Sequence, residues 1–422
     1  MGLQILYSVL GFILAIGVLV VVHEFGHFWV ARLLGVKVLR FSVGFGRPIW
    51  SRRGGKDNTE YVLSALPFGG YVKMLDENEG EVKAEELPRA FNRQRLWKRA
   101  AIVLAGPGFN FLFAILAYWL IFMAGVDGIK PVVGKVAENS IAERSGFQVG
   151  DEWLRVDGKE VQSWDQHRLY IYQRALDRAD VTVEVRDAGG YLQTRRLDLS
   201  GLAASQIDAG LMEQGIGLYG YIPQLAPVLG SVKAGGPAAQ AGLQVGDRIV
   251  AIGNKPVTDW QEVVKEIAQH PQQALHLSVM RKDERHELTV TPRAVTANGK
   301  TDGKIDAGVQ LPEIPEEWRV TVKSDPLTAL WRGVENTWAM SVLTLKMLYK
   351  MLLLEVSTDN ISGPITIAQY AGYSVQIGLE RFVMFLAVVS ISLGVLNLLP
   401  IPILDGGHLL FYAVEAVKGS PP

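Results

Sequence analysis

Two histidines four residues apart, with a glutamate after the first, carry the clearest chemistry in this sequence. The segment reads His23-Glu24-Phe25-Gly26-His27. Positions i and i+4 share one face of an α-helix, so both imidazoles can bind one metal ion. Glu24 is adjacent and can accept a proton from a water molecule at that metal. The pattern predicts a metal site with a carboxylate base. The alternative is a group of polar residues with a structural role at a helix end.

The composition limits which metal sites are possible. None of the 422 residues is cysteine, which excludes disulfides, thiolate metal sites and a cysteine nucleophile. The 42 Lys and Arg balance 43 Asp and Glu, so no basic field indicates nucleic acid, and no nucleic-acid partner is expected. Hydrophobic residues make up 49% of the chain and mean hydropathy is +0.17. These values argue against a disordered chain and against an ordinary soluble protein.

Three long uncharged stretches are predicted to cross a membrane as helices. They are Leu3–Val22, Ala100–Gly125, which contains Gly106-Pro107-Gly108, and Phe382–Leu399. About twenty helical residues cover roughly 30 Å, the thickness of the hydrocarbon layer. A cleaved signal peptide is the alternative for the first stretch, but no Lys or Arg precedes it. A fourth stretch, Ala329–Leu354, has a charged stripe and is predicted to be an interfacial amphipathic helix.

Basic residues predict the orientation of the spans. Many of them lie between the first two stretches, and none lies before the first. The positive-inside rule therefore places residues 35–99 in the cytoplasm and residues 126–380 outside. The third span then returns the chain to the cytoplasmic side, where Asp405 follows it.

Topology also selects the third metal ligand. A catalytic zinc site uses three protein ligands and keeps one open position. His167, His270, His276 and His286 are predicted outside, which leaves Asp405 and His408 on the side of His23 and His27. We expect one Zn²⁺ per chain, held by His23, His27 and Asp405. His408 is expected to be a neighbouring polar residue, with a ligand role as the alternative.

The external segment contains an internal repeat at an offset of 96 residues. Gln148-Val149-Gly150-Asp151 and Trp164 recur as Gln244-Val245-Gly246-Asp247 and Trp260. Copies of this length are duplicated domains, and the sequence resembles a tandem pair of PDZ domains. PDZ domains bind extended peptide ends by strand addition. Leu218 and Val309 are the candidates for the peptide grooves; the alternative is that the domains are rigid spacers.

Taken together, these motifs resemble the site-2 protease family of intramembrane metalloproteases. The resemblance rests on His-Glu-x-x-His in the first span, Asn-x-x-Pro-x-x-x-x-Asp-Gly from Asn397 to Gly406, and the PDZ-like repeat between them. Further matching segments are Gly44-Phe45-Gly46, Pro67-Phe68-Gly69-Gly70-Tyr71-Val72-Lys73-Met74 and Ser362-Gly363-Pro364. The resemblance covers Val20 to Gly419. Members of this family usually carry a further transmembrane helix beyond the region of Lys418.

The resemblance implies roles for individual residues. His23, His27 and Asp405 would bind zinc, and Glu24 would activate the attacking water. Asn397 and Pro400 would hold the unwound substrate, and Gly44, Phe45 and Gly46 are grouped with them as substrate-binding residues. The implied substrates are single-span membrane proteins of the anti-sigma-factor type, already trimmed by a first protease, and remnant signal peptides. The implied setting is the bacterial inner membrane and its sigma-E envelope stress response, with periplasmic PDZ domains.

A transmembrane helix must unwind before it can be cleaved, and inside lipid its freed backbone groups need partners. Residues 60–66 read as a short strand, and Pro67-Phe68-Gly69-Gly70 as a turn leading into Tyr71–Met74. We expect this hairpin to dip into the membrane and receive the substrate by strand addition along Tyr61, Val62, Leu63, Ser64 and Ala65. The alternative is an ordinary cytoplasmic hairpin.

The predicted fold is an α+β multi-domain membrane protein: a transmembrane helix bundle with a membrane-associated β-hairpin and two tandem PDZ domains. The predicted segments are a first span (1–34), a re-entrant β region (35–99), a second span (100–125), PDZ domains (126–225 and 226–315), an interfacial helix and linker (316–380) and a third span (381–422). The predicted function is an intramembrane zinc endopeptidase with single-span substrates and the lipid bilayer as partners. The alternative is a membrane-tethered PDZ scaffold whose metal site is structural.

Overall fold

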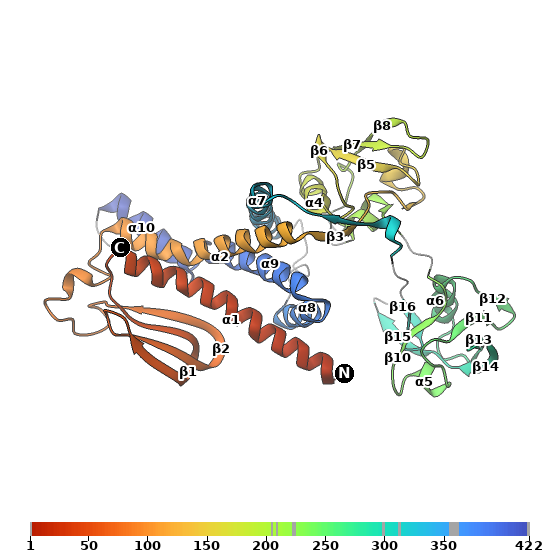
Figure 1. Cartoon of the computed structure of the whole chain (residues 1–422), viewed down its shortest axis with the longest axis horizontal. Helices are drawn as coiled ribbons and strands as arrows, with labels where there is room; N and C mark the ends of the chain where they lie inside the picture. The colour runs from red at the N-terminus through yellow and green to blue at the C-terminus, as the bar shows by residue number, and fades with distance from the viewer. Residues whose placement is uncertain are drawn as a thin grey trace. The chain divides into compact units, whose positions relative to one another are not determined.

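The computed structural model describes residues 2–203, 206–207, 210–221, 225–297, 300–310, 314–353 and 363–419. The chain forms two compact units (Figure 1). The first unit contains Met1–Pro131, Val136–Leu218 and Val320–Pro422. The second contains Val132–Lys135 and Tyr219–Arg319.

Three long apolar helices form the centre of the first unit. They are α1 (Gly2–Leu33), α2 (Leu96–Ala124) and α9 (Leu379–Asn397). Each is long and apolar enough to cross a membrane, which confirms the three predicted apolar helices. In Figure 1, α2 lies beside both α1 and α9, and it packs against each of them. Because α1 continues past Val22 to Leu33, the His-Glu-x-x-His segment lies within a helix, as its spacing predicts.

The third predicted apolar stretch, Phe382–Leu399, corresponds to α9, and the segment 381–422 that contains it holds two helices. Helix α9 ends at Asn397, and a separate helix, α10 (Asp405–Lys418), begins at Asp405. Pro400 and Pro402 lie between the two helices. Proline has no backbone N–H and restricts the residue before it, so the helix cannot continue through this segment. The break places Asp405 in the first turn of a new helix.

Two further helices pack on this core. Helix α7 (Pro326–Leu352) corresponds to the predicted amphipathic helix, and the Asp325 side chain caps its first turn. Helix α8 (Pro364–Ile377) lies in the segment predicted as linker, so that prediction is wrong there. Part of the linker, 354–362, and Ser362 of the Ser-Gly-Pro motif lie outside the described residues. A Cβ at Gly372 would fall 2.5 Å from Ser8 Cα, so glycine allows α8 to approach α1 closely.

Two long, bent strands, β1 (Val38–Gly54) and β2 (Thr59–Met74), follow α1. Residues 67–70 lie inside β2, and a separate turn at 55–58 joins the two strands. Segment 40–43 pairs with 60–63 in ascending order and with 70–73 in descending order, so the chain reverses direction between 63 and 70, as the predicted turn requires. The strands bend where glycines adopt positive φ, at Gly44, Gly46 and Gly69. These bends let each strand fold back, so that segment 40–43 is paired with both 70–73 and 60–63.

The first repeat domain belongs to the first unit. Its antiparallel sheet has the order β6-β5-β7-β8. Its elements are α3 (Ile141–Arg144), β5 (Glu152–Val156), β6 (Lys159–Glu160), α4 (Arg168–Leu176), β7 (Val181–Arg186), β8 (Leu192–Leu197) and η3 (Leu211–Ile216).

The second repeat domain forms most of the second unit. Its main sheet has the matching order β12-β11-β13-β14. Its elements are β10 (Leu229–Val232), α5 (Pro237–Gln240), β11 (Arg248–Ile252), β12 (Lys255–Pro256), α6 (Trp260–Gln269), β13 (Leu275–Arg281), β14 (Glu284–Val290), β15 (Arg293–Ala297), β16 (Lys300–Lys304) and β17 (Ala307–Val309).

The structure confirms the internal repeat. Helices α3 and α5, strands β5 and β11, and strands β6 and β12 are each separated by the predicted 96 residues. The turn before β5 and the turn before β11 contain the same hydrogen bond. The Gln148 N–H donates to buried Asp151 at 3.0 Å, and the Gln244 N–H donates to buried Asp247 at 2.9 Å. Each of these carboxylates also pairs with an arginine, Arg195 or Arg281.

Short elements complete the chain. They are η1 (Leu87–Arg89), β3 (Val126–Ile129), β4 (Lys135–Val136), β9 (Leu218–Tyr219), η4 (Glu316–Trp318) and β18 (Arg319–Val322). Strand β3 directly follows α2, strand β18 precedes α7, and the two strands pair. The Thr321 hydroxyl donates to Asp127 at 2.6 Å across this pair. The chain therefore leaves and re-enters the helical core at one place.

Candidate metal centre and substrate cleft

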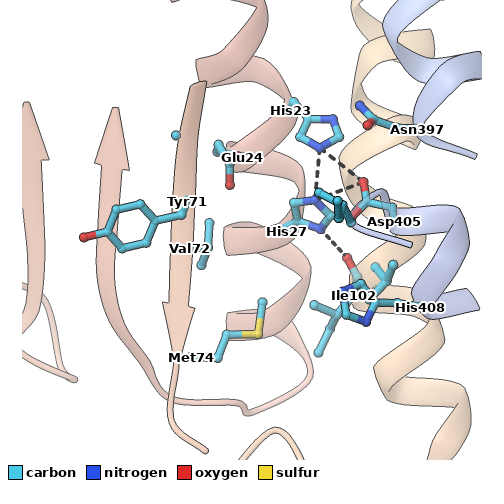
Figure 2. Close-up of a pocket in the computed structure, with 13 residues that line it drawn as sticks. His23, Glu24, His27, Tyr71, Val72, Met74, Ile102, Asn397, Asp405 and His408 are labelled. Atoms are coloured by element: carbon cyan, nitrogen blue, oxygen red, sulfur yellow. Dashed lines mark hydrogen bonds and ion pairs between the residues drawn. The ribbon is translucent and has the colours of Figure 1, made fainter. Parts of the chain in front are cut away.

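Helix α1 presents His23 and His27 on one face, and their Nε2 atoms lie 3.3 Å apart. Both side chains are nearly buried, with exposed fractions of 15% and 12%. One turn of helix separates the rings, so the spacing in the sequence becomes a pair of converging nitrogens (Figure 2).

Asp405 reaches the same point from α10. Its Oδ2 atom lies 3.2 Å from His23 Nε2 and 3.5 Å from His27 Nε2. Asp405 lies in the first turn of α10, where the positive end of the helix dipole stabilises a carboxylate. Adjacent Gly406 and Gly407 let the preceding loop fold closely over this turn, since a Cβ at either would fall within 2.5 Å of a loop carbonyl oxygen.

These three side chains have the donor set of a zinc site. One ligand atom from each lies within 4.8 Å of the others, and within the described part of the chain no other such group is found. Asp405 Oδ2 is buried and has no hydrogen-bond donor among the described residues, although two imidazole nitrogens face it. Two imidazoles and one carboxylate, with room for a further ligand, suit Zn²⁺.

Helix α2 forms the wall behind the two histidines. A Cβ at Gly106 would fall 2.2 Å from His27 Nε2 and 2.8 Å from His23 Cε1, so only glycine fits there. The Ile102 carbonyl oxygen lies 2.8 Å from His27 Nδ1. The Asn110 side chain lies 3.2 Å from His23 Nδ1. Each imidazole is therefore held on its outer nitrogen by α2 while its Nε2 faces Asp405.

Helix α10 is tied to α2 at its far end. Arg99 forms an ion pair with Glu415, and both side chains are 15% exposed. The Arg99 guanidinium carbon also lies 5.0 Å from the centre of the Tyr412 ring, a cation–π distance. Because Asp405 begins the same helix, these contacts help to hold its carboxylate near the histidines.

A cavity of about 400 Å³ opens beside the three converging side chains. Figure 2 shows Glu24 between α1 and the strand that carries Tyr71 and Val72, on the side away from Asp405. The residues lining the cavity come from α1, β2, α2 and the α9–α10 region. They are His23, Glu24, His27, Gly70, Tyr71, Val72, Met74, Ile102, Val103, Asn397, Ile403, Asp405 and His408.

The strand beside the cavity is segment 70–74, not the predicted segment 61–65. Residues 70–73 pair on one side with 40–43, and the described residues include no strand on their other side. Gly70, Tyr71 and Val72 all line the cavity. Consecutive residues of a strand point to opposite faces, so a cavity that touches all three lies along the strand's edge.

The predicted receiving strand is an interior one. Residues 60–63 pair with both 40–43 and 50–53, so neither edge is open to a further strand. Tyr61, Val62, Leu63, Ser64 and Ala65 are also not among the residues that line the cavity. Segment 60–63 therefore offers no free edge for strand addition, which argues against a substrate pairing at Tyr61, Val62 and Leu63. The physical reason is that β1 folds over them on both sides.

Only some of the other predicted site residues line the cavity. Asn397 and His408 line the cavity, and Pro400 lies in the loop between α9 and α10. Gly44, Phe45 and Gly46 do not line it, but the Phe45 ring stacks on that of Tyr71, with centres 6.2 Å apart. Phe45 therefore contacts the edge strand through Tyr71.

The two groove candidates lie in the repeat domains. Leu218 is fully buried, so it cannot contact a peptide in this conformation. Val309 is half-buried in β17, where it pairs with Leu229.

The sequence reasoning did not single out Tyr71, Val72, Gly106 and Asn110 as functional. Each of these four residues has a feature in the sequence that could have identified it. Tyr71 and Val72 belong to a motif that supported the family resemblance, and Gly106 interrupts a predicted span. Asn110 is an isolated polar residue in that apolar span, where polar side chains are costly.

Comparisons with known proteins agree with this geometry. The model of peptidase family M50 matches residues 11–422. The Salmonella typhimurium regulator of sigma-E protease RseP is 43% identical over 420 residues, covering 99% of this chain and 93% of that protein. Escherichia coli RseP is 42% identical over 419 residues, with the same coverage. A Vibrio cholerae protein described as a candidate zinc metalloprotease is 42% identical over 420 residues, covering 99% of this chain and 92% of that protein.

Among solved structures, a PDZ domain of an SdrC-like protein from Listeria monocytogenes aligns with 21% of this chain and 92% of that chain. Its identity is 20% and its TM-score 0.18, and a likeness at that score supports no argument about this protein. The family assignment rests on the family model and the full-length relatives. With a family match over almost the whole chain and two histidines and a carboxylate meeting at one point, the chain belongs to peptidase family M50 and is a zinc metalloprotease.

Proposed function

We propose that this protein is an intramembrane endopeptidase that cleaves the transmembrane segments of single-span membrane proteins. The observation that carries the proposal is the arrangement around one cavity. His23, His27 and Asp405 converge on one side, an open strand edge runs along the other, and Glu24 lies between them.

In this proposal His23 Nε2, His27 Nε2 and an Asp405 oxygen hold one zinc ion per chain. Bound zinc would supply Lewis acidity, which polarises a peptide carbonyl and makes a water molecule more acidic. His408 lines the cavity but is not part of the converging group. Three protein ligands leave a position for water and substrate, as catalysis requires.

Glu24 is the proposed general base. Its carboxylate accepts a proton from the water molecule whose oxygen forms a bond to the peptide carbonyl carbon. It then delivers that proton to the nitrogen as the C–N bond breaks. Glu24 follows His23 directly on α1 and therefore points about 100° away from it around the helix, towards the strand side of the cavity.

The edge of segment 70–74 is the proposed substrate platform. An unwound substrate segment would pair with this edge as an added strand. Its carbonyl groups would then lie between the strand and α1, beside Glu24. Pairing also provides hydrogen bonds for backbone groups that lipid cannot satisfy. Asn397 lines the same cavity and can contact the substrate from the opposite wall.

The relatives support a more specific role. Proteins named regulator of sigma-E protease, 42–43% identical to this chain, indicate substrates of the anti-sigma-factor type. We place the protein in the bacterial inner membrane, with α1, α2 and α9 as spans and the two repeat domains as periplasmic PDZ domains. With three spans, segment 35–95 and α10 lie on the same side of the membrane, where the site requires both.

Zinc content and cleavage test this proposal together. We expect Glu24→Gln to retain zinc and to lose cleavage of a transmembrane peptide in detergent by several orders of magnitude, because only the proton acceptor is removed. Asp405→Ala should lose cleavage and also lower the zinc content, because a ligand is removed. The measurements are metal analysis of the purified protein and peptide cleavage by mass spectrometry.

A matched control is Glu60→Gln, a carboxylate on the interior strand that pairs with Arg40 outside the cavity. It should retain both zinc and activity. Full cleavage by Glu24→Gln would contradict the role of Glu24 and favour a scaffold with a structural metal. Unchanged zinc content in Asp405→Ala would contradict the ligand assignment.

A further inference from the structure

Asn110 is a fully buried amide in the middle of α2. Its Nδ2 atom lies 3.2 Å from Nδ1 of His23. Its Oδ1 atom is buried and has no hydrogen-bond partner among the described residues. A buried amide with an unsatisfied oxygen beside a metal-binding histidine requires an explanation.

The chemistry of a metal-bound imidazole provides one. A neutral imidazole has one protonated nitrogen and one with a free lone pair. The Nε2 atom of His23 faces Asp405 and His27, so this is the nitrogen that would bind zinc. The proton must then lie on Nδ1, which becomes a hydrogen-bond donor and needs an acceptor.

His27 shows the matching arrangement. Its Nδ1 atom lies 2.8 Å from the Ile102 carbonyl oxygen, which can only accept a hydrogen bond. The partner of His23 must accept in the same way. An amide places oxygen and nitrogen at nearly equivalent positions, and half a turn about its last side-chain bond exchanges them. That turn brings Oδ1 of Asn110 to His23 Nδ1 and moves Nδ2 into the position that Oδ1 leaves.

We propose that Asn110 is a positioning residue whose Oδ1 accepts a hydrogen bond from His23 Nδ1–H and keeps Nε2 free for zinc. The inference rests on the proposed function of His23 as a zinc ligand. Asn110 acts through His23 and does not touch the substrate. Residues that orient metal ligands typically change metal affinity by roughly 10–100-fold when they are removed.

Three variants of the full-length protein in detergent test the assignment. Asn110→Leu keeps a similar side-chain volume but cannot accept a hydrogen bond. Asn110→Asp can accept one. Ser390→Ala is the matched control, because the Ser390 hydroxyl donates to the main-chain oxygen of Asn110 at 2.9 Å and leaves the amide side chain untouched. Zinc affinity is measured by competition with a chromogenic chelator, and the ligand field by the visible spectrum of the Co²⁺-loaded protein.

We expect Asn110→Leu to weaken zinc binding about 10–100-fold and to alter the Co²⁺ spectrum. Asn110→Asp and Ser390→Ala should bind zinc within a few-fold of the wild type. Wild-type zinc affinity in Asn110→Leu would overturn the inference, as would an equal loss in Asn110→Asp and Asn110→Leu. His23→Ala distinguishes a failure of the zinc-ligand assignment of His23 from a failure of the positioning role of Asn110. If it binds zinc as the wild type does, the ligand assignment fails and this inference fails with it.

Discussion

Gly106 determines how closely α2 can approach the two histidines. Adding one methyl group here would place a carbon on His27 Nε2, in the position that a metal ligand needs. We expect Gly106→Ala to lower zinc affinity at least about 10-fold while the helices still form, because alanine favours a helix more than glycine does. Chelator competition measures the affinity, and circular dichroism measures the helix content.

Gly108 is the matched control for this prediction. It lies two residues away on the same helix, is exposed, and a Cβ there would meet nothing within 4 Å. Gly108→Ala should therefore keep wild-type zinc affinity. Equal affinities in the two variants would show that α2 does not limit the metal site in the way proposed.

A second prediction for a single residue concerns His167 and the effect of pH on the stability of the first repeat domain. His167 is 7% exposed, at the start of α4 in the first repeat domain. Burial lowers the pKa of His167 to about 4, and the positive charges of Lys159 and Arg332 act in the same direction. In the unfolded chain the pKa of histidine is near 6.5. Its contribution to stability is therefore fully present above pH 6.5 and is lost as the pH falls towards 4.

Hydrogen exchange of strands β5 and β7 at pH 7 and pH 5 measures this effect. Protection should fall at pH 5 in the wild type, by at most about 2 kcal/mol in local stability. His167→Gln should remove most of the difference between the two pH values. His276→Gln, at an exposed position on β13, should leave the wild-type behaviour unchanged. The same loss of protection in His167→Gln and wild type would contradict the assignment.

At the scale of secondary-structure elements, strand β2 performs two tasks in different segments. Residues 60–63 hold the sheet together from its interior, and residues 70–74 present an edge to the cavity. The bends at Gly44, Gly46 and Gly69 make this division possible. Without these bends, segment 40–43 could not pair with both 60–63 and 70–73, and the two segments would not divide into an interior strand and an edge strand.

Cysteine cross-linking can identify the receiving strand, because the protein has no native cysteine. In a Glu24→Gln background, which we expect to leave the substrate uncut, Val72→Cys should form a disulfide with a substrate cysteine next to the scissile bond. Leu63→Cys is the control. Its side chain is 47% exposed, so access is not limiting, but its strand is paired on both sides. Non-reducing gels measure the product. A cross-link from Leu63 and none from Val72 would contradict the edge assignment.

At the scale of the whole molecule, the repeat domains are an insertion between two paired strands, β3 and β18. The first repeat domain also contacts α7. Lys159 pairs with Glu335 at 2.7 Å, and Asp177 pairs with Lys346 at 2.7 Å. The sequence left open whether these domains filter substrates by size or capture peptide ends. Leu218 is fully buried and Val309 is half-buried, so burial removes only the first of the two groove candidates.

Deleting the insertion tests that choice. If the domains act as a size filter, replacement of residues 130–318 by a short Gly/Ser linker should allow cleavage of untrimmed single-span proteins, because the excluding bulk would be gone. Trimmed substrates should still be cut. Cleavage of both substrate forms is followed in detergent and in liposomes. If the deletion instead lowers cleavage of trimmed substrates and leaves untrimmed ones uncut, the domains capture new peptide ends.

The sequence by itself determined the local features. Helical spacing put His23 and His27 on one face, hydropathy predicted α1, α2 and α9, and the repeat offset predicted the duplicated domain. Topology along the chain also narrowed the third ligand to Asp405 and His408, because charge asymmetry and the number of spans require only the order of segments. Each of these properties is a periodicity, a repeat or an order of segments along the chain, and none of them requires the positions of residues in space.

The tertiary structure alone decided which strand borders the cavity and what α2 does. Whether a strand is interior or at an edge depends on which segments fold against it, and segments 60–63 and 70–73 have similar local patterns. The roles of Gly106 and Asn110 depend on contacts with residues more than 75 positions away. A glycine or an amide in an apolar helix looks the same in the sequence whether it faces lipid or a metal ligand. Only the packing of α2 against α1 distinguishes the two cases.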